Sequence, residues 1–467
     1  MAIELEQGQE LAESLLALVG PRGLLSGADV QARSCDPLRP APTLARLIVR
    51  PADTQELAAV LALCARHGQR VVVHGGRTGV SGGAYTSEQD IVVSLERMSR
   101  IEDICTASNT AVVQAGVTVE ALQNAAHEHG LFYPIDLGSK GSATIGGTIA
   151  TNAGGNRVIR WGMTRQNVLG IEAVLADGSV VSAMNRLLKN NTGYDLKHLF
   201  IGSEGTFGVV SRAVVKLVPL PITQSVAFVS VASYGQVIEL LSLARRLQTL
   251  SAFEVMWSDF YDLMAASGTD RQPLPVGQPF YVLIEGLGYS RKSDDDAFGA
   301  FLEGALEAGL IVDAVVAVSD KQRQDLWRVR EGSEIIVREM SPFISFDISI
   351  ELPRIEVYLE QVGAALRDRF PQVRMVTFGH LGDNNIHIGV TIGAETRCCE
   401  HQIEHLVYDP LPAFGGAITA EHGIGQFKRS YLAEQKSPTE LDVMRRLRLA
   451  MDPNRQLNPD VMDSFDR

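Results

Sequence analysis

The sequence predicts an α+β protein built from two large domains, and three observations support this. The chain has 467 residues, which is more than one compact core normally holds. Three long glycine-rich segments all lie before about residue 219, where the run VPLPIT is typical of a domain boundary. From residue 224 onward predicted strands and helices alternate, which favours a sheet covered by helices on one side.

The N-terminal half is predicted to alternate short strands with helices after a helical lead-in over residues 1–38. Asp53 begins a helix, because DTQE matches a capping pattern, and this helix ends near Gly68. Asp177-Gly178 predicts a tight hairpin between two strands. The remaining predicted elements are strands over 70–74, 91–94 and 111–115 and a helix over 117–129 that Gly130 closes.

The C-terminal half contains the alternating strands and helices. Its predicted strands cover 225–231, 279–285, 311–317, 344–350, 373–378 and 386–391. Its predicted helices cover 235–247, 295–308, 320–340, 354–369 and 437–451, the last of which ends at Asp452-Pro453.

The charge balance and the cysteines narrow the function classes. The formal net charge is −13, which argues against nucleic acid as a partner because phosphate binding needs clustered Lys and Arg. No signal peptide or bilayer-spanning apolar run is recognised, so we expect a cytoplasmic protein. No CxxC pair occurs, and free thiols are therefore expected at Cys35, Cys64, Cys105, Cys398 and Cys399.

The glycine-rich segments point to a ligand that carries phosphate. They are HGGRTGVSGG (74–83), DLGSKGSATIGGTIATNAGG (136–155) and IGSEGTFG (201–208). Backbone amides approach a pyrophosphate only where no side chain intervenes, and glycine also reaches the backbone angles that turn successive N–H groups inward. The first segment fits neither the GxGxxG dinucleotide fingerprint nor a phosphate loop ending in GK[ST]. A tight turn would explain one such segment, but three in one domain favour a binding function.

Two short motifs in the C-terminal half bring histidines and an acid together. FGHLGDNNIH (378–387) carries His380 and His387 on either side of a segment that can turn. ITAEHGIGQFKR (418–429) carries Glu421 and His422. Two histidines and a carboxylate are a familiar ligand set for zinc or manganese, with positions left open for substrate. A lone histidine is more often structural, and the spacing alone leaves a structural role and a metal site about equally favoured.

Three stretches of the chain resemble one flavoprotein family. VRPADTQELAAVLALCARHGQRVVVHGGRTGVSGG is similar to the first half of the FAD domain of the vanillyl-alcohol oxidase/p-cresol methylhydroxylase (PCMH) superfamily. YPIDLGSKGSATIGGTIATNAGG and NTGYDLKHLFIGSEGTFGVV are similar to its second half, and the resemblance extends from about 39 to 459. It implies a two-subdomain PCMH-type FAD-binding domain over 39–219, a substrate- and metal-binding domain over 220–430, and a C-terminal helical segment over 431–467 that returns to the FAD domain.

The resemblance also implies which residues hold FAD. The implied pyrophosphate residues are Gly75, Gly76, Arg77, Thr78 and Gly79. The implied flavin residues are Gly138, Ser142, Thr144, Gly146, Gly147, Asn152 and Gly155, with Glu204 and Gly205 nearby. Some relatives tether FAD through a histidine just after the first GG pair, but here Arg77 holds that place and His74 precedes the glycines. The second block has no cysteine for a thioether link, so the resemblance implies non-covalent FAD.

GH-x-GD-x-N-x-H and AEHG-x-G resemble the signatures of D-lactate dehydrogenases and D-2-hydroxyglutarate dehydrogenases within this superfamily. One departure is Asn384, where the family has glycine, and asparagine also tolerates left-handed backbone angles. Arg330, in LWRVRE, matches the arginine that binds the substrate carboxylate. The other implied roles are metal ligand for His380, His387 and Glu421, catalytic base for His422, and substrate contact for Asn385 and His422.

The implied activity is the oxidation of a D-2-hydroxy acid by FAD and a divalent metal, zinc or manganese. Hydride leaves C2 for FAD, the metal stabilises the forming alkoxide, and a neutral histidine takes the hydroxyl proton. Electrons would then pass to an acceptor other than NAD, such as an electron-transfer flavoprotein, a quinone or a cytochrome. Two alternatives stay open, a D-2-hydroxyglutarate dehydrogenase and the flavin subunit of a glycolate-oxidising complex. We expect a homodimer.

Two positions predict a D-lactate-like substrate with an uncharged tail. Enzymes specific for D-2-hydroxyglutarate have a threonine four residues after the equivalent of Arg330 and a lysine two residues before the equivalent of Asp347. Here those positions hold Glu334 and Ser345. Without a hydrogen-bond donor and a cation, desolvation of a second carboxylate is costly. The alternative is that another arginine compensates, Arg338 or Arg323.

Overall fold

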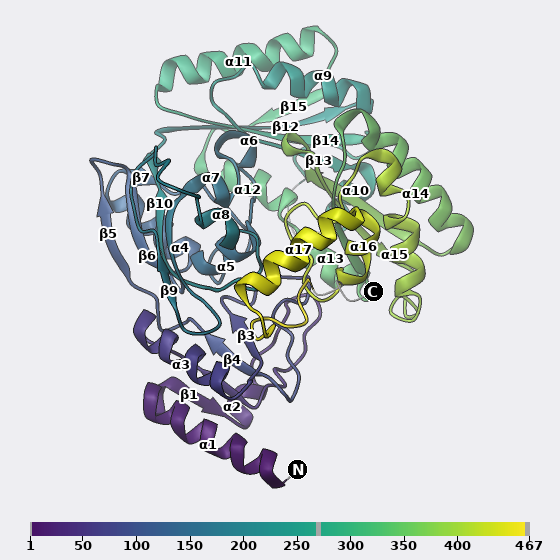
Figure 1. The fold of residues 1–467 in the computed structure, drawn as a ribbon. Coiled ribbons are helices and arrows are strands. Elements are labelled where there is room, and N and C mark those ends of the chain that lie inside the picture. Colours follow the sequence, from purple (N-terminus) through teal and green to yellow (C-terminus); the bar gives the residue numbers. More distant parts are fainter. Residues whose placement is uncertain (1, 268–271, 463–467) are drawn as a thin grey trace. The chain divides into compact units, whose positions relative to one another are not determined.

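The computed structural model describes residues 2–267 and 272–462, and the chain divides into two compact units (Figure 1). Unit 1 holds the residues up to Gly155, Gly162–Leu220 and the residues from Glu421 onward, and unit 2 holds Asn156–Trp161 and Pro221–Ala420. The chain therefore leaves unit 2 for the last time between Ala420 and Glu421, inside the ITAEHG motif. None of the described helices combines the length and the apolar character needed to cross a lipid bilayer.

A four-stranded sheet begins unit 1, in the order β1 (Leu24–Ser26), β2 (Leu47–Val49), β4 (Ile91–Ser94) and β3 (Val71–His74). Strands β2, β4 and β3 are parallel, and β1 is antiparallel to β2. The Asp53 carboxylate caps the following helix by accepting from the N–H groups of Gln55 and Glu56. Strand β1 lies within the segment predicted to be wholly helical. The helices of this part are α1 (Ala2–Val19), η1 (Pro21–Gly23), α2 (Ala28–Gln31) and α3 (Thr54–Arg66).

A five-stranded antiparallel sheet follows, in the order β5 (Ile101–Cys105), β6 (Thr110–Gln114), β10 (Val209–Lys216), β8 (Val168–Val174) and β9 (Val180–Ser182). The β8–β9 hairpin turns through Asp177-Gly178 as predicted, with Gly178 at φ +88°. The two sheets correspond to the two subdomains that the resemblance implied. Also in this part are α4 (Val119–Glu128), α5 (Ile145–Thr151), α7 (Thr164–Asn167), α8 (Lys197–Phe200) and the strand pair β7 (Leu131–Phe132) and β11 (Val218–Pro219).

The C-terminal helices belong to unit 1, so the chain returns to the unit that holds the three glycine-rich segments. They are α16 (Arg429–Gln435) and α17 (Pro438–Met451). Ser437 starts α17 through a capping box with Glu440. The buried Arg448 of α17 donates to the backbone carbonyls of Thr206 and Leu457, so it ties the helix to the segment that follows Glu204.

Unit 2 is built on a seven-stranded sheet in which every neighbouring pair is antiparallel. Its order is β15 (Asp313–Val316), β12 (Thr223–Val231), β14 (Phe280–Gly288), β13 (Leu250–Trp257), β17 (Arg374–His380), β18 (Asn385–Thr391) and β16 (Ile344–Ser349). The helices are α6 (Val158–Trp161), α9 (Tyr234–Ala244), α10 (Ser258–Ala266), α11 (Arg291–Glu307), α12 (Asp320–Arg330), α13 (Ser333–Met340), η2 (Leu352–Arg354), α14 (Ile355–Arg369), η3 (Leu381–Asp383), α15 (Glu400–Tyr408) and η4 (Leu411–Phe414). Helices α9 and α11 pack on β12 and β14 (Figure 1).

The structure corrects two predictions in unit 2. Strand β13 was not predicted, although it lies at the centre of the sheet between β14 and β17. The helix predicted over 320–340 is two helices, because the chain bends at Glu331-Gly332. A Cβ at Gly332 would lie 2.3 Å from the Met264 sulfur, so a side chain there would clash with α10. The break makes Arg330 the last residue of α12.

Candidate active site

The first two glycine-rich segments meet in unit 1, although 52 residues separate them. A Cβ at Gly76 would lie 1.9 Å from the Ser142 carbonyl oxygen, and a Cβ at Gly75 would lie 2.7 Å from Thr144 Oγ1. Thr144 in turn accepts from the Gly147 N–H at 3.2 Å and caps α5. Backbone therefore packs directly on backbone at Gly76 and on the Thr144 side chain at Gly75, so a side chain at either position would clash.

Other predicted cofactor glycines have different surroundings. An added Cβ at Gly79 or Gly138 would meet no described atom within 4 Å, so these stretches of backbone face open space. Gly146 instead packs against Ala115, whose Cβ would lie 2.6 Å away, which gives this glycine a packing role. Arg77 and Asn152 have left-handed backbone, at φ +56° and +51°. With such backbone angles, the two segments can present successive N–H groups to a ligand.

His74 is turned into the protein. Its side chain is buried, and its Nε2 bonds to the Ala84 carbonyl oxygen at 2.9 Å. Burial lowers the pKa of His74 to about 4, because the imidazolium would lose its hydration. The ring is therefore neutral near pH 7 and donates to that carbonyl.

Two contacts within unit 1 hold the chain around His422. The buried Glu204 accepts from the Ile424 N–H at 2.7 Å and from the Gly425 N–H at 2.9 Å. Burial raises the pKa of Glu204 to about 7, and the two N–H donors oppose that rise by stabilising the carboxylate. The Gly155 N–H donates to Glu421 Oε1 at 2.7 Å, which connects the second glycine segment with the predicted metal ligand.

The β17–β18 hairpin of unit 2 places the two predicted histidine ligands. His380 ends β17 opposite Asn385, and His387 lies in β18 opposite Phe378. Asn384, in the turn between them, has φ +72°, which is the left-handed conformation that asparagine tolerates. The two imidazole centroids are 5.4 Å apart, and each ring offers a nitrogen within 4.8 Å of the other's. The hairpin therefore brings His380 and His387 together as ligands of one ion would be.

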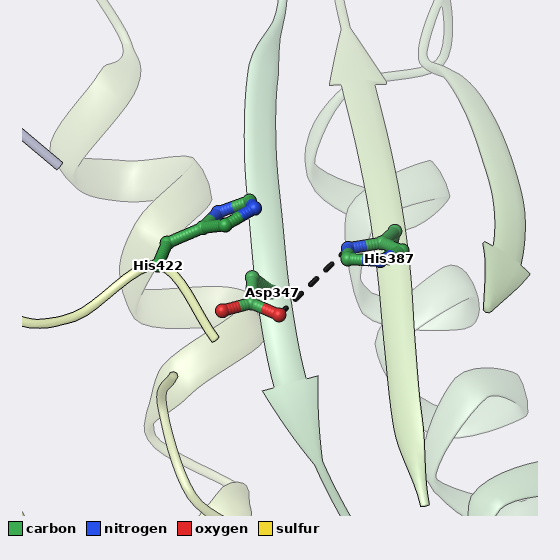
Figure 2. Close-up of side chains that lie close together, drawn as sticks. All are labelled: Asp347, His387 and His422. Atoms are coloured by element: carbon green, nitrogen blue, oxygen red, sulfur yellow. Dashed lines mark ion pairs between the residues drawn. The ribbon is translucent and has the colours of Figure 1, made fainter. Parts of the chain in front are cut away.

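A buried carboxylate lies next to Nδ1 of each histidine. Glu254 of β13 accepts from His380 Nδ1 at 3.0 Å, and its side chain is 1% exposed. Asp347 of β16 is fully buried, with its Oδ1 3.8 Å from His387 Nδ1 (Figure 2). Both strands are paired so that acid and histidine lie opposite each other in the sheet. Nδ1 faces the acid in each ring, which is the arrangement that metal-binding histidines usually have.

Asp347 also binds the last two residues of unit 2, Thr419 and Ala420. Its Oδ2 accepts from Thr419 Oγ1 and from the Ala420 N–H, both at 3.0 Å. Glu421 and His422 are the next two residues of the chain and the first of the last segment of unit 1. Within unit 2 the structure therefore brings together His380, His387, Asp347 and the start of the ITAEHG motif, Thr419 and Ala420. Glu421 and His422 belong to unit 1.

The two predicted substrate residues of unit 2 are both buried. Arg330 is 6% exposed, donates from Nε to Glu254 Oε2 at 2.9 Å, and lies over the Phe378 ring at 4.8 Å. Asn385 is 3% exposed, and neither atom of its side-chain amide finds a hydrogen-bond partner in the described part of the chain. Because buried polar atoms are normally hydrogen-bonded, Asn385 is the residue most clearly set up to bind something else.

The two positions used to predict the substrate tail, Ser345 and Glu334, lie in different surroundings. Ser345 is on the β16 face that carries Asp347, directly opposite Gly389. The nearest neighbours of a Cβ at Gly389 are carbon atoms of Val376, Phe343 and Ile336, at 3.0, 3.8 and 3.9 Å. Glu334 is an exposed residue of α13. The position opposite Ser345 is therefore surrounded by apolar side chains.

Sequence reasoning missed Glu254 and missed any role for Asp347. Both residues are single acids inside apolar strands, in SAFEVMW and ISFDISI. Acids are almost never fully buried unless they are paired, so an acid in a run of central-strand character signals a partner. That signal was readable in both runs, but the identity of the partner was not.

Comparisons with known proteins agree on a flavoprotein. The family model for the "FAD binding domain" matches residues 45–183, and that for "FAD linked oxidases, C-terminal domain" matches residues 220–462. A D-2-hydroxyglutarate dehydrogenase of Xanthomonas citri pv. viticola is 38% identical over 417 residues, which cover 88% of each chain. The mitochondrial D-2-hydroxyglutarate dehydrogenase of Bos taurus is 36% identical over 448 residues, 96% of this chain and 82% of the relative. A mitochondrial protein of Schizosaccharomyces pombe named for D-lactate dehydrogenase activity is 34% identical over 438 residues, 91% and 83%.

Solved structures share the fold. p-Cresol methylhydroxylase with substrate bound has a TM-score of 0.80 at 14% identity, covering 98% of this chain and 97% of that one. Alkyldihydroxyacetonephosphate synthase has a TM-score of 0.74 at 16% identity, covering 97% and 84%. The matched domains define a flavin-dependent oxidoreductase, and its fold is that of p-cresol methylhydroxylase. The chain belongs to the FAD-linked oxidase family, and its cofactor is FAD.

Proposed function

We propose that this protein oxidises a D-2-hydroxy acid with an uncharged tail, such as D-lactate, to the 2-oxo acid with the help of a divalent metal. The observation that carries the proposal is that Arg330 and His380 share the buried Glu254 in unit 2, with the His387 ring 5.4 Å from that of His380. A 2-hydroxy acid needs both features, a cation for its carboxylate and a metal for its chelating oxygens. The relatives that were compared are named for D-2-hydroxyglutarate or D-lactate.

The residues fit zinc or manganese. Imidazole nitrogens and a carboxylate suit either ion, and metal-bound histidines usually donate their second N–H to an acid, as His380 does to Glu254. In the proposal His380, His387 and Glu421 are the ligands. A divalent ion held there would supply Lewis-acid stabilisation of the substrate hydroxyl oxygen as it loses its proton.

The protein's own residues bind the substrate and move one proton. Arg330 binds the carboxylate, and Asn385 Nδ2 donates to a substrate oxygen, which would satisfy this buried donor. His422, as a neutral imidazole, takes the hydroxyl proton. The C2–H bond breaks with its electron pair while the C=O bond forms, and the FAD of this family supplies the hydride acceptor.

The apolar side chains around Gly389, which lies opposite Ser345, support the uncharged tail. A second carboxylate beside Ser345 would face Val376 and Ile336 across Gly389, which offer no hydrogen bond or charge. Glu334 adds no cation. The names of the relatives favour D-2-hydroxyglutarate as the second candidate, in which case an arginine such as Arg338 must reach the tail carboxylate.

The bound state of FAD and the electron acceptor belong to the same proposal. FAD is held without a covalent link, because His74 is buried against the Ala84 carbonyl and Arg77 holds the place of a tethering histidine. Reduced FAD would pass its electrons to a non-NAD acceptor such as an electron-transfer flavoprotein, a quinone or a cytochrome.

A dye-reduction screen of the isolated chain tests the function. We expect turnover with D-lactate and D-2-hydroxybutyrate, lower kcat/KM with D-2-hydroxyglutarate, and none with the L-enantiomers. A clear preference for D-2-hydroxyglutarate would overturn the tail assignment while leaving the chemistry. Activity that appears only when other subunits are added would favour the flavin subunit of a glycolate-oxidising complex.

A further inference from the structure

We propose that Glu254 is a positioning residue that sets the carboxylate-binding Arg330 and the metal-ligating His380 at the same time. One buried carboxylate then couples metal binding to substrate binding. The inference rests on the proposed function, because it assumes that Arg330 meets the substrate and that His380 meets the metal.

The geometry joins all three residues around a single carboxylate. Glu254 lies opposite His380 where β13 pairs with β17, so the sheet itself brings the two side chains together. Both carboxylate oxygens lie near His380 Nδ1, Oε1 at 3.0 Å and Oε2 at 2.8 Å. Arg330 Nε and Nη2 approach Oε2 at 2.9 and 2.8 Å from the end of α12.

Burial makes these contacts significant. The Glu254 side chain is 1% exposed and that of Arg330 is 6% exposed. A carboxylate in the centre of a sheet loses its hydration, and a buried ion pair is often no more stable than apolar side chains of the same size. Stability alone therefore gives little reason for an acid here. Its partners are two residues that the function needs, which favours a role in positioning them.

Glu254 fixes what each partner can offer. Arg330 has five N–H donors in a planar fork, and the edge that carries Nε and Nη2 faces Glu254, so Nη1 is the nitrogen directed elsewhere. For His380, an acid at Nδ1 favours the tautomer with the proton on Nδ1, which leaves the Nε2 lone pair for a metal. Removing the acid would loosen both arrangements.

The neighbouring strand supplies a matched control. Glu285 of β14 is fully buried and also binds an arginine, Arg157, from Oε1 to Nε at 2.9 Å. Its other partners are Ser251 Oγ at 2.8 Å, Gln224 Nε2 at 2.8 Å and Trp327 Nε1 at 3.2 Å. None of these is a predicted metal ligand. Glu285→Gln therefore removes a comparable buried charge without touching His380.

The experiment compares metal affinity and kinetics in the FAD-loaded full chain. Protein stripped with a chelator is titrated with Zn²⁺ by calorimetry, and with Co²⁺ by visible absorption, for wild type, Glu254→Gln, Glu254→Asp and Glu285→Gln. Loss of the acid behind a ligand histidine usually weakens metal binding ~10–100-fold, and we expect this for Glu254→Gln. We also expect a raised KM for D-lactate at saturating Zn²⁺. Glu285→Gln should lose stability and keep its Zn²⁺ affinity.

The outcomes separate a positioning role from a structural one. Wild-type Zn²⁺ affinity and wild-type KM in Glu254→Gln, with stability alone reduced, would overturn the proposal. If Glu254→Gln does not fold, Glu254→Asp decides, because it keeps the charge but is too short to hold both partners. Normal Zn²⁺ affinity and KM in that variant would overturn the proposal as well. Wild-type protein that binds neither ion would instead refute the metal site of the proposed function.

Discussion

Replacing Arg330 by methionine tests the substrate-binding assignment most directly. The change removes a guanidinium that approaches Glu254 Oε2 through Nε at 2.9 Å and Nη2 at 2.8 Å, and keeps a side chain of similar reach. Breaking a buried ion pair costs about 3–5 kcal/mol of unfolding free energy. His380 still faces the acid, so we expect the free energy of unfolding to fall by about 3 kcal/mol. Chemical denaturation of the FAD-loaded protein measures this loss.

The catalytic loss is separate from the loss of stability. A hydrogen bond to a charged group contributes about 1.5–3 kcal/mol, so losing the contact between the guanidinium and the substrate carboxylate should cost about 3 kcal/mol. That corresponds to roughly 150-fold in kcat/KM. The assay is anaerobic stopped-flow reduction of FAD over a range of D-lactate concentrations, which reports the chemical step without the acceptor.

Two controls isolate the charge interaction. Arg328 precedes Arg330 by two residues, is half exposed, and pairs with Asp325 at 3.2 Å, so Arg328→Met should reduce FAD at the wild-type rate. The methyl ester of D-lactate has no carboxylate, so wild type and Arg330→Met should differ little with it. An Arg330→Met enzyme that keeps the wild-type kcat/KM for D-lactate would refute the role of Arg330.

Four further predictions address the remaining groups. His422→Ala should slow FAD reduction ~10²–10⁴-fold at saturating substrate, the usual contribution of a general base, and unchanged reduction would mean that the proton goes elsewhere. Acid precipitation should release the yellow colour into the supernatant, whereas colour kept in the pellet would show a covalent flavin. A strong chelator should abolish turnover while FAD stays bound, and Zn²⁺ or Mn²⁺ should restore it; full activity in protein shown by elemental analysis to be metal-free would exclude a role for the ion. Gly76→Ala should lower FAD occupancy, because its Cβ would lie 1.9 Å from the Ser142 oxygen, while Gly83→Ala, with nothing within 4 Å among the described residues, should not.

Much of the fold could be predicted because its signals are local. Asp53 accepts from N–H groups two and three residues ahead, and Asp177-Gly178 turns within its own hairpin. The histidine hairpin is of the same kind, since His380 and His387 are connected by a turn in which Asn384 takes the left-handed conformation that its side chain tolerates. In these cases the residues that form the structure are neighbours in the chain.

The missed features depend on contacts that are distant in sequence. Strand β13 is an apolar run flanked by helices, and a short apolar run alone does not separate a buried strand from a buried helix. The partner of Glu254 is His380, which is 126 residues away in the sequence. Gly332, at the break between α12 and α13, lies against Met264, on a helix that was also not predicted. No local pattern contains these partners.

The same reasoning explains how the chain fixes the segment around His422, the proposed catalytic base. The stretch from Thr419 to Gly425 has little regular structure, and glycines at 423 and 425 with positive φ would leave it mobile in isolation. Two buried acids fix its ends separately: Asp347 binds the Ala420 N–H in unit 2, and Glu204 binds the Ile424 N–H in unit 1. His422 lies midway between the two anchored amides, two residues from each. Either acid can therefore influence the position of His422 through the backbone, so mutations at Asp347 or Glu204 should be read as effects on the geometry of His422 before any direct role in proton transfer is assigned to them.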